Sequence, residues 1–286
     1  IDLNTIQPLS VIRDIITSDD MEYEGRRNFT SVNPAITKSN ELIWVEGYSH
    51  QKCVNIGSVS RRISSSTSKV LPGIRKLHAL SLGRDQVIIS TGGESTVVLS
   101  NNDQSLVKIL AEKKHVIDLH QVNNSEFIVI SNDSAELVSR KLDGTYFRKG
   151  RMEIGTTVQQ SAYSSELQLL LLLMSNRFHF FRIGNTTFVE AGTVYMNSSV
   201  HSITLCSSFA IVTFWGSSEC GAIDLQSQEF LKSFTVPTTI VDMKVLRAGG
   251  KRFCVFAFTD STVKVAEVSI EKSVLKMGQF KEVFRS

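Results

Sequence analysis

The residues of this chain best suited to nucleophilic or metal chemistry are its six histidines and four cysteines. Nucleophilic catalysis requires a base beside the nucleophile, and a metal site requires several ligands at short spacing. The histidines are spread over most of the chain, and no two cysteines have a C-x-x-C spacing. These residues are His50, His78, His115, His120, His179 and His201, with Cys53, Cys206, Cys220 and Cys254. We therefore predict no catalytic residues, no metal and no cofactor.

Two other kinds of segment could bind a ligand. Asp19, Asp20, Glu22 and Glu24 are close together, but they lack the regular ligand spacing of a calcium loop. We interpret them as part of a solvated acidic loop. The pairs Gly92-Gly93 and Gly249-Gly250 do not continue into a phosphate-binding pattern with a following helix, so we interpret them as turns.

One short segment matches a modification site. Arg61-Arg62-Ile63-Ser64 has two arginines shortly before a serine, the pattern that basophilic kinases recognise. Phosphorylation of Ser64 would add nearly two negative charges to the segment. The stretch from Arg61 to Lys69 is rich in serine and low in complexity, so we expect a mobile, solvated loop there. Ser64 is thus either a phosphorylation site or a residue of that loop.

Composition limits the classes of partner. The 286 residues are 42% hydrophobic, and the net charge is only +3, with the basic residues scattered. We therefore expect no direct binding of nucleic acid by this domain. The longest apolar run, Leu167 to Met174, is under half of the about 20 residues that cross a bilayer, so we expect no membrane span.

Cys206 and Cys254 lie in apolar runs and are interpreted as core residues in a reducing compartment.

A repeated pattern positions all of these residues. It is a short apolar run that ends in a small or polar turn, and its six copies start 45, 40, 43, 40 and 44 residues apart. The copies begin at Leu42, Val87, Phe127, Leu170, Ala210 and Cys254. A period near 42 residues with strand-like content is typical of a β-propeller, in which each repeat forms one four-stranded blade. We predict an all-β, WD40-like propeller with six visible blades, as a single domain over residues 1–286.

Alternation and turn residues locate the strands of each repeat. In the third repeat we predict strands over His115–His120, Glu126–Ile130, Ala135–Lys141 and Tyr146–Lys149, with a hairpin turn at Leu142-Asp-Gly-Thr. The fifth and sixth repeats are expected to start at Val200 and Ile240. The second strand of each blade is nearly all apolar, and the third and fourth alternate toward a solvated rim.

The first repeat is irregular. Its opening strand, predicted over Leu9 to Ile16, is separated from Leu42 by the polar stretch Ser18 to Asn40, which we expect to form a long surface loop.

Three motifs resemble those of a known family. They are Leu71-Pro-Gly-Ile-Arg-Lys-Leu, Ile211-Val-Thr-Phe-Trp-Gly with the following Ala222-Ile-Asp-Leu, and the segment Phe256 to Val265. They look like the middle propeller of the very large three-propeller scaffolds, whose order and spacing fit from about Leu9 to Phe280. That family holds the large subunit of the damaged-DNA-binding complex, its heterochromatin-silencing relatives, and the large subunits of the cleavage–polyadenylation and splicing-factor complexes. The family's propeller has seven blades, so the resemblance implies a seventh and a larger multi-propeller protein.

The resemblance implies a function. The match at Leu71-Pro-Gly-Ile-Arg favours the branch that adapts cullin-type ubiquitin ligases in DNA repair or chromatin silencing, in the nucleus and cytoplasm. Its expected partners are the amino-terminal region of a cullin, substrate receptors and chromatin factors. The alternatives are a scaffold subunit of a polyadenylation or splicing complex and, from another class, a propeller hydrolase with its site on the channel loops.

The resemblance also points to a partner-binding site. Trp215 matches a tryptophan of the family's cullin-facing surface, and Met243 stands where the family has a cullin-facing arginine. We predict a partner-binding surface formed by Trp215, Asp242 and Met243 on one face, because their segments belong to adjacent blades. The sequence leaves two interpretations of Trp215 open. Its ring is either an exposed interface anchor or a side chain packed between blades.

Overall fold

Every regular element in the described part of the chain is a β-strand. The computed structural model describes the backbone of residues 35–36, 41–48, 51–59, 63–71, 78–82, 86–90, 96–100, 106–108, 116–248, 250–271 and 274–285. Side chains are described from residue 116 on, except for residues 232–233, 247–249, 271–274 and 284–286. The predicted strand from Leu9 to Ile16 and most of the polar stretch after it lie outside the described residues.

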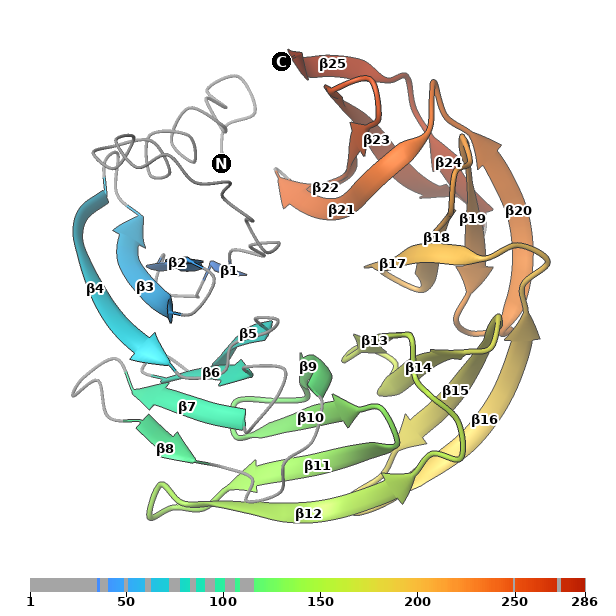
Figure 1. The fold of residues 1–286 in the computed structure, drawn as a ribbon. Coiled ribbons are helices and arrows are strands. Elements are labelled where there is room, and N and C mark those ends of the chain that lie inside the picture. The colour runs from blue at the N-terminus through green and yellow to red at the C-terminus, as the bar shows by residue number, and fades with distance from the viewer. Residues whose placement is uncertain are drawn as a thin grey trace. The chain divides into compact units, whose positions relative to one another are not determined.

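The chain divides into two compact units, Ile1–Lys149 and Gly150–Ser286, which are described separately. The first unit holds three sheets with sequential, antiparallel strand order, and the last strand of the third sheet crosses into the second unit (Figure 1). The first sheet consists of β1 (Ala35–Ile36), β2 (Glu41–Tyr48), β3 (Gln51–Val59) and β4 (Ile63–Leu71). The second consists of β5 (His78–Leu82), β6 (Gln86–Ser90), β7 (Thr96–Ser100) and β8 (Leu106–Lys108). The third consists of β9 (Val116–Gln121), β10 (Glu126–Ser131), β11 (Ser134–Arg140) and β12 (Tyr146–Glu153).

The second unit holds three further sheets of the same kind. The fourth sheet consists of β13 (Gln160–Ser164), β14 (Leu169–Met174), β15 (Arg177–Ile183) and β16 (Phe188–Tyr195). The fifth consists of β17 (Val200–Cys206), β18 (Phe209–Phe214), β19 (Glu219–Asp224) and β20 (Glu229–Thr235). The sixth consists of β21 (Ile240–Ala248), β22 (Lys251–Phe258), β23 (Thr262–Glu271), β24 (Val274–Met277) and β25 (Lys281–Arg285). β24 and β25 pair with successive parts of β23, so together they form the outer strand of this sheet.

Six consecutive sheets of this kind confirm the predicted blades, and each apolar repeat falls on the second strand of one sheet. The predicted starts at Val200 and Ile240 are also the starts of β17 and β21. All six residues of β14 and of β18 are buried, as expected for strands covered on both faces. The fourth strands β12 and β16 mix exposed and partly buried residues, as expected toward a solvated rim.

The third strands depart in part from the prediction. β15 mixes buried and exposed residues, but the first six residues of β11 are all buried. Glu136 on β11 keeps a partner despite its burial, since its Oε1 lies 3.5 Å from Arg148 Nη1 on the neighbouring outer strand. A charged side chain can therefore occupy a buried strand here because it is paired.

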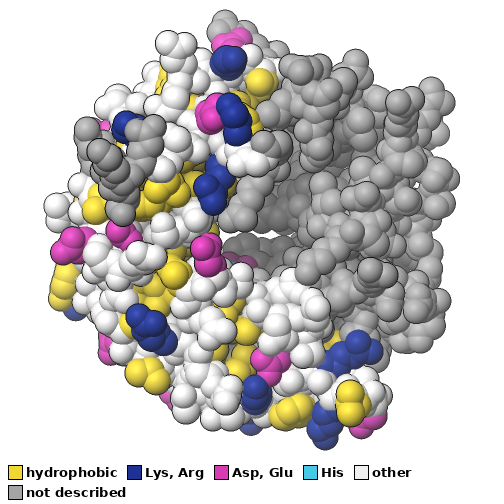
Figure 2. Space-filling model, turned by 180° about the vertical axis from the view of Figure 1, so that it is seen from behind, with side chains coloured by type: hydrophobic (Ala, Val, Ile, Leu, Met, Phe, Trp, Pro, Cys, Tyr) yellow, Lys and Arg dark blue, Asp and Glu magenta, His cyan; other side chains and the backbone are white. Residues whose placement is uncertain are grey.

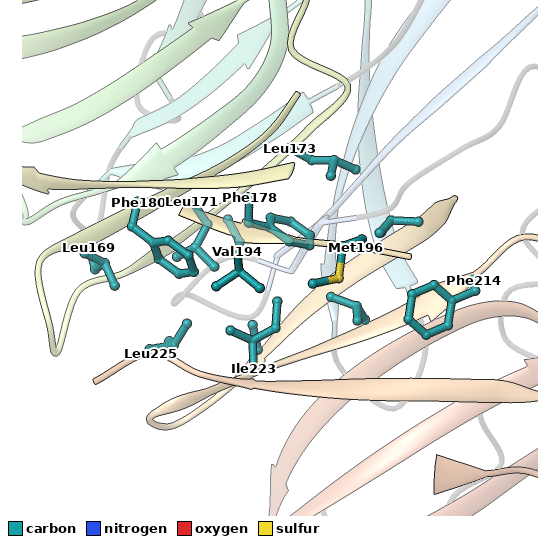
Figure 3. Close-up of a cluster of buried hydrophobic side chains, with 14 residues drawn as sticks. Leu169, Leu171, Leu173, Phe178, Phe180, Val194, Met196, Phe214, Ile223 and Leu225 are labelled. Atoms are coloured by element: carbon teal, nitrogen blue, oxygen red, sulfur yellow. The ribbon is translucent and has the colours of Figure 1, made fainter. Parts of the chain in front are cut away.

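The space between the fourth and fifth sheets is filled by one apolar cluster (Figure 3). Leu171 from β14 and Phe178 and Phe180 from β15 pack with Val212 from β18 and Ile223 from β19, and all five are at most 1% exposed. A second cluster lies between the fifth and sixth sheets and includes Cys206, Cys220 and Cys254. These cysteines are free thiols in the core, which confirms the predicted burial of Cys206 and Cys254.

The hairpin turn between β11 and β12 is confirmed. Gly144 has a φ of +85°, which favours glycine, and its N–H donates to Lys141 O over 3.0 Å. Asp143 Oδ1 accepts hydrogen bonds from the Thr145 N–H (2.9 Å) and from Thr145 Oγ1 (2.6 Å). These local bonds fix the turn from the side chains that the sequence provides.

Candidate partner-binding site

Trp215 follows directly after β18, at the turn that leads into β19. Phe214, the last residue of β18, is only 7% exposed and packs in the apolar cluster between the fourth and fifth sheets. The Trp215 N–H donates to Ser199 O over 3.0 Å, and the chain then turns at Gly216, whose φ is +63°. The next side chain after Phe214 is thereby directed outward, and Trp215 is 67% exposed. Of the two interpretations left open by the sequence, the exposed one describes this side chain.

His201 holds one edge of the Trp215 ring. The centroids of the two rings are 4.1 Å apart, and the ring planes are inclined by 62°. The strand pairing passes from Val200 to Ser202, so His201 is the extra residue of a β-bulge in β17. Its main-chain oxygen accepts a hydrogen bond from Gln160 Nε2 on β13, which ties the bulge to the preceding sheet. The Trp215 ring is therefore restrained on one side and open to solvent on the other.

The start of β21 lies next to the Trp215 turn. Ser217 O accepts a hydrogen bond from the Ile240 N–H over 3.4 Å, and Thr204 Oγ1 on β17 donates to Met243 O over 3.1 Å. Val241 is the extra residue of a second bulge and is 49% exposed. The neighbouring Asp242 has an exposed side chain. We refer to Trp215, His201, Val241 and Asp242 together as the Trp215 surface.

The carboxylate of Asp242 is held close to the main chain. Its Oδ1 accepts a hydrogen bond from the Met243 N–H over 2.8 Å and lies 4.0 Å from Lys244 Nζ. The same local bond occurs on β9, where Asp118 Oδ1 accepts from the Leu119 N–H over 2.9 Å. Such a bond limits the rotamers of Asp242, whose side chain is 52% exposed.

The prediction that Met243 belongs to this surface is wrong. Met243 is 1% exposed and packs in the cluster between the fifth and sixth sheets. Strict alternation from the buried Ile240 would place residue 243 outside. The bulge at Val241 adds one residue to the strand, so that Val241 and Asp242 both face out and Met243 turns into the core.

The serine-rich segment also differs from the prediction. Most of the stretch expected to be a mobile loop is strand β4 (Ile63–Leu71), which pairs with β3 from Lys52 to Val59. The pairing with β3 makes this segment the last strand of the first sheet. The side chain of Ser64 lies outside the described residues, so its phosphorylation stays a prediction.

Among the histidines whose side chains are described, His120 and His179 each lie beside a carboxylate, whereas the buried Nδ1 of His201 has no hydrogen-bond partner. His120 Nε2 lies 3.6 Å from Asp118 Oδ2, and His179 Nδ1 lies 3.2 Å from Glu190 Oε1. Within residues whose side chains are described, no three histidine, cysteine or acidic side chains converge as metal ligands.

In the described part of the chain, no helix is long and apolar enough to span a membrane. On the face drawn in Figure 2, basic and acidic side chains are interspersed with apolar ones.

Sequence reasoning missed His201 and Val241 as members of the surface. Both are bulge residues near the start of a first strand, and Ile117 on β9 occupies the same kind of position. The segments Val116-Ile-Asp-Leu and Ile240-Val-Asp-Met share an apolar pair, an aspartate and a buried apolar residue. This shared pattern is the signal that points to the bulge at Val241, whereas Val200-His-Ser-Ile lacks it, so no such signal marks His201.

Comparison with known proteins supports the fold alone. No family model and no curated protein sequence matches the chain. Among solved structures, the WD40 domain of SCAP from fission yeast is 12% identical with a TM-score of 0.58, over 88% of this chain and 74% of that one. BBS1N in complex with ARL6 is 12% identical with a TM-score of 0.63, over 89% and 91% of the two chains. The chain thus has the β-propeller fold.

The same fold also occurs in an enzyme. Dihydro-heme d1 dehydrogenase NirN, in complex with DHE, is 12% identical to this chain with a TM-score of 0.62. The match covers 92% of this chain and 66% of that one. At such identities the likeness gives the architecture, and function must be argued from the side chains.

Proposed function

We propose that this chain is a non-catalytic protein-interaction propeller and that it binds a partner through the Trp215 surface. The observation that carries the proposal is the 67% exposure of Trp215, a large ring restrained by His201. Exposed, pre-organised aromatic side chains are the usual anchors of protein interfaces, because they bury much area at a small loss of side-chain entropy. WD40 propellers are often interaction scaffolds, which is consistent with this use of the fold.

The finer proposal is an adaptor propeller of a nuclear cullin-type ubiquitin ligase in DNA repair or chromatin silencing. It is supported by the resemblance of the segment Ile211 to Gly216 and of the Leu71-Pro-Gly-Ile-Arg motif to that family branch. The partner in this case is the amino-terminal region of a cullin, while substrate receptors or chromatin factors are bound elsewhere in a larger protein. Because Met243 is buried, the contact is centred on Trp215, with Val241 and Asp242 beside it.

Binding to a purified cullin fragment tests this proposal. The propeller is immobilised, and the recombinant amino-terminal region of each member of a cullin panel is titrated over it. We expect saturable binding of one cullin, weakened about tenfold or more in Trp215→Ala. The control is Glu166→Gln, which changes an exposed residue distant from this surface in sequence and is expected to bind the cullin as the wild type does.

Other results separate the alternatives. Binding of no cullin, together with Trp215-dependent capture of purified polyadenylation or splicing subunits, would replace the ligase proposal with an RNA-processing scaffold. Binding of a cullin that is unaffected in Trp215→Ala would reject the Trp215 surface as the docking site. Hydrolysis of ester or peptide substrates by the purified chain would overturn the non-catalytic assignment.

A further inference from the structure

A groove of about 540 Å³ lies in the second unit, away from the Trp215 surface in sequence. One wall is the end of β12 and the following residues, from Met152 to Thr156. The other wall is formed by alternate residues of β15, namely Arg177, His179 and Phe181, with Glu190 from β16. Its volume is in the range of sites that hold a small ligand or a few residues of a peptide.

The floor of the groove is apolar. Ile154, Met174 and Phe181 line it and are at most 9% exposed. Thr156 Oγ1 donates to Met174 Sδ over 3.4 Å, which holds the thioether at the end of the groove. Methionine side chains adapt to ligands of different shape, and Met152 provides a second one. This floor fits an aliphatic side chain.

Two carboxylates line the rim of the groove, and Arg151, outside the lining, is paired with one of them. The lining includes the carboxylates of Glu153 and Glu190 but only one guanidinium, that of Arg177. The guanidinium carbon of Arg177 lies 4.3 Å from the centroid of the Tyr195 ring, so this cation interacts partly with the ring. The side chains of Glu153 and Glu190 are 68% and 57% exposed, respectively.

Each carboxylate keeps an oxygen for a ligand. Glu153 Oε1 lies 2.5 Å from Arg151 Nε, and Glu190 Oε1 lies 3.2 Å from His179 Nδ1. The Oε2 atoms of both residues have no partner among the described residues. A basic side chain entering the groove can therefore bond to either Oε2 atom without breaking an existing contact.

We propose that this groove binds an extended peptide segment with an aliphatic residue followed two positions later by lysine or arginine. In an extended chain these two side chains point to the same face, which matches a groove with an apolar floor and an acidic rim. The aliphatic side chain lies on Ile154, Met174 and Phe181, and the basic group binds Glu190 and Glu153. An acidic peptide is disfavoured by the same two carboxylates.

Fluorescence anisotropy with labelled, capped heptapeptides tests the proposal. The probe is Ala-Ala-Leu-Ala-Lys-Ala-Ala, compared with peptides that carry Glu or Gln in place of Lys, or Ser in place of Leu. We expect saturable binding of the probe, and binding of the Glu peptide that is weaker by about tenfold or more. Binding of the probe is also expected to weaken at higher salt. The Ser peptide is expected to bind more weakly, because it loses the apolar contact.

Two variants test the place of binding. Gly155→Phe is expected to block the groove without disturbing the fold, because nothing lies within 4 Å of a Cβ atom added at Gly155. Glu190→Gln is expected to reduce the preference for Lys over Glu, whereas Glu229→Gln, an exposed residue on β20, leaves it unchanged. Thermal melts confirm that each variant is folded. The proposal is overturned by absent saturation, by equal binding of the Lys and Glu peptides, or by full binding in folded Gly155→Phe.

Discussion

The Trp215 indole meets the His201 imidazole edge-on, with ring centroids 4.1 Å apart and planes inclined by 62°. His201 lies on β17, and Trp215 directly follows β18. These two strands form one hairpin, paired from Val200 with Phe214 to Cys206 with Phe209. Without the bulge, His201 would take a regular place in the strand pairing. With the bulge, it is an extra residue whose ring supports the exposed indole, so the proposed docking anchor depends on a backbone irregularity.

Trp215→Ala is expected to change stability little. The ring is 67% exposed, and exposed substitutions usually alter the free energy of unfolding by about 0.5 kcal/mol or less. Phe214→Ala, one residue earlier and 7% exposed, is expected to cost about 3–5 kcal/mol. Urea unfolding of both variants measures the difference. Equal losses in the two variants would place the Trp215 ring in the core and remove it from the docking surface.

Much of the fold could be predicted from the sequence because the apolar run in each repeat marks a buried strand. The apolar runs at Leu170 and Ala210 match strands that are covered on both faces, and such strands need no partner information to be recognised. The exposed position of Trp215 was only one of two interpretations, since an aromatic residue at the end of a strand suits both a core and a surface.

The errors have a common physical cause. A bulge is a property of two paired strands, and the alternation within one strand does not report it. The burial of Met243 follows from the bulge at Val241 and was therefore missed. In the same way, strand β4 is defined by its hydrogen bonds to β3, whereas its serine-rich composition is typical of a loop.

Leu171→Ala is expected to destabilise the second unit strongly. Leu171 is completely buried in the cluster between the fourth and fifth sheets, and its truncation leaves a cavity there (Figure 3). Such substitutions cost about 2–5 kcal/mol. Val189→Ala on the outer strand β16, where the side chain is 58% exposed, is the control and is expected to cost little. If guanidinium denaturation gave similar midpoints for the two variants, the assignment of this core would be contradicted.

Glu126 is expected to contribute stability that depends on pH. Burial opposes its ionisation, but hydrogen bonds from Lys149, at 2.6 Å, and from Asn123, at 2.7 Å, outweigh burial and lower the pKa below its ordinary value of 4.5. Because the pKa is lower in the folded state, this stability is present above about pH 4.5 and is lost as the pH falls through the lowered pKa. Glu126→Gln should therefore be less stable than the wild type at pH 7, by about 1 kcal/mol or less.

The difference between the wild type and Glu126→Gln should shrink as the pH is lowered from 5 toward 3. Urea unfolding at several pH values measures it, and Glu166→Gln, an exposed residue without a described ion pair, is the matched control. A difference that is constant over this range would show that the carboxylate of Glu126 has the same pKa in the folded and unfolded chain.

The buried thiols are expected to be almost unreactive in the folded protein. Burial, with a smaller contribution from Glu219, raises the pKa of Cys220 to about 12, and burial also raises the pKa of Cys254. The thiolate is the nucleophile, so at pH 8 both low ionisation and lack of access slow alkylation. Iodoacetamide should modify Cys220 and Cys254 at least about a hundredfold more slowly in the native protein than in denaturant. Peptide mapping by mass spectrometry after timed quenching resolves each site. Rapid labelling of Cys220 in the native protein, with an unchanged circular dichroism spectrum, would show that the cluster between the fifth and sixth sheets is open to solvent.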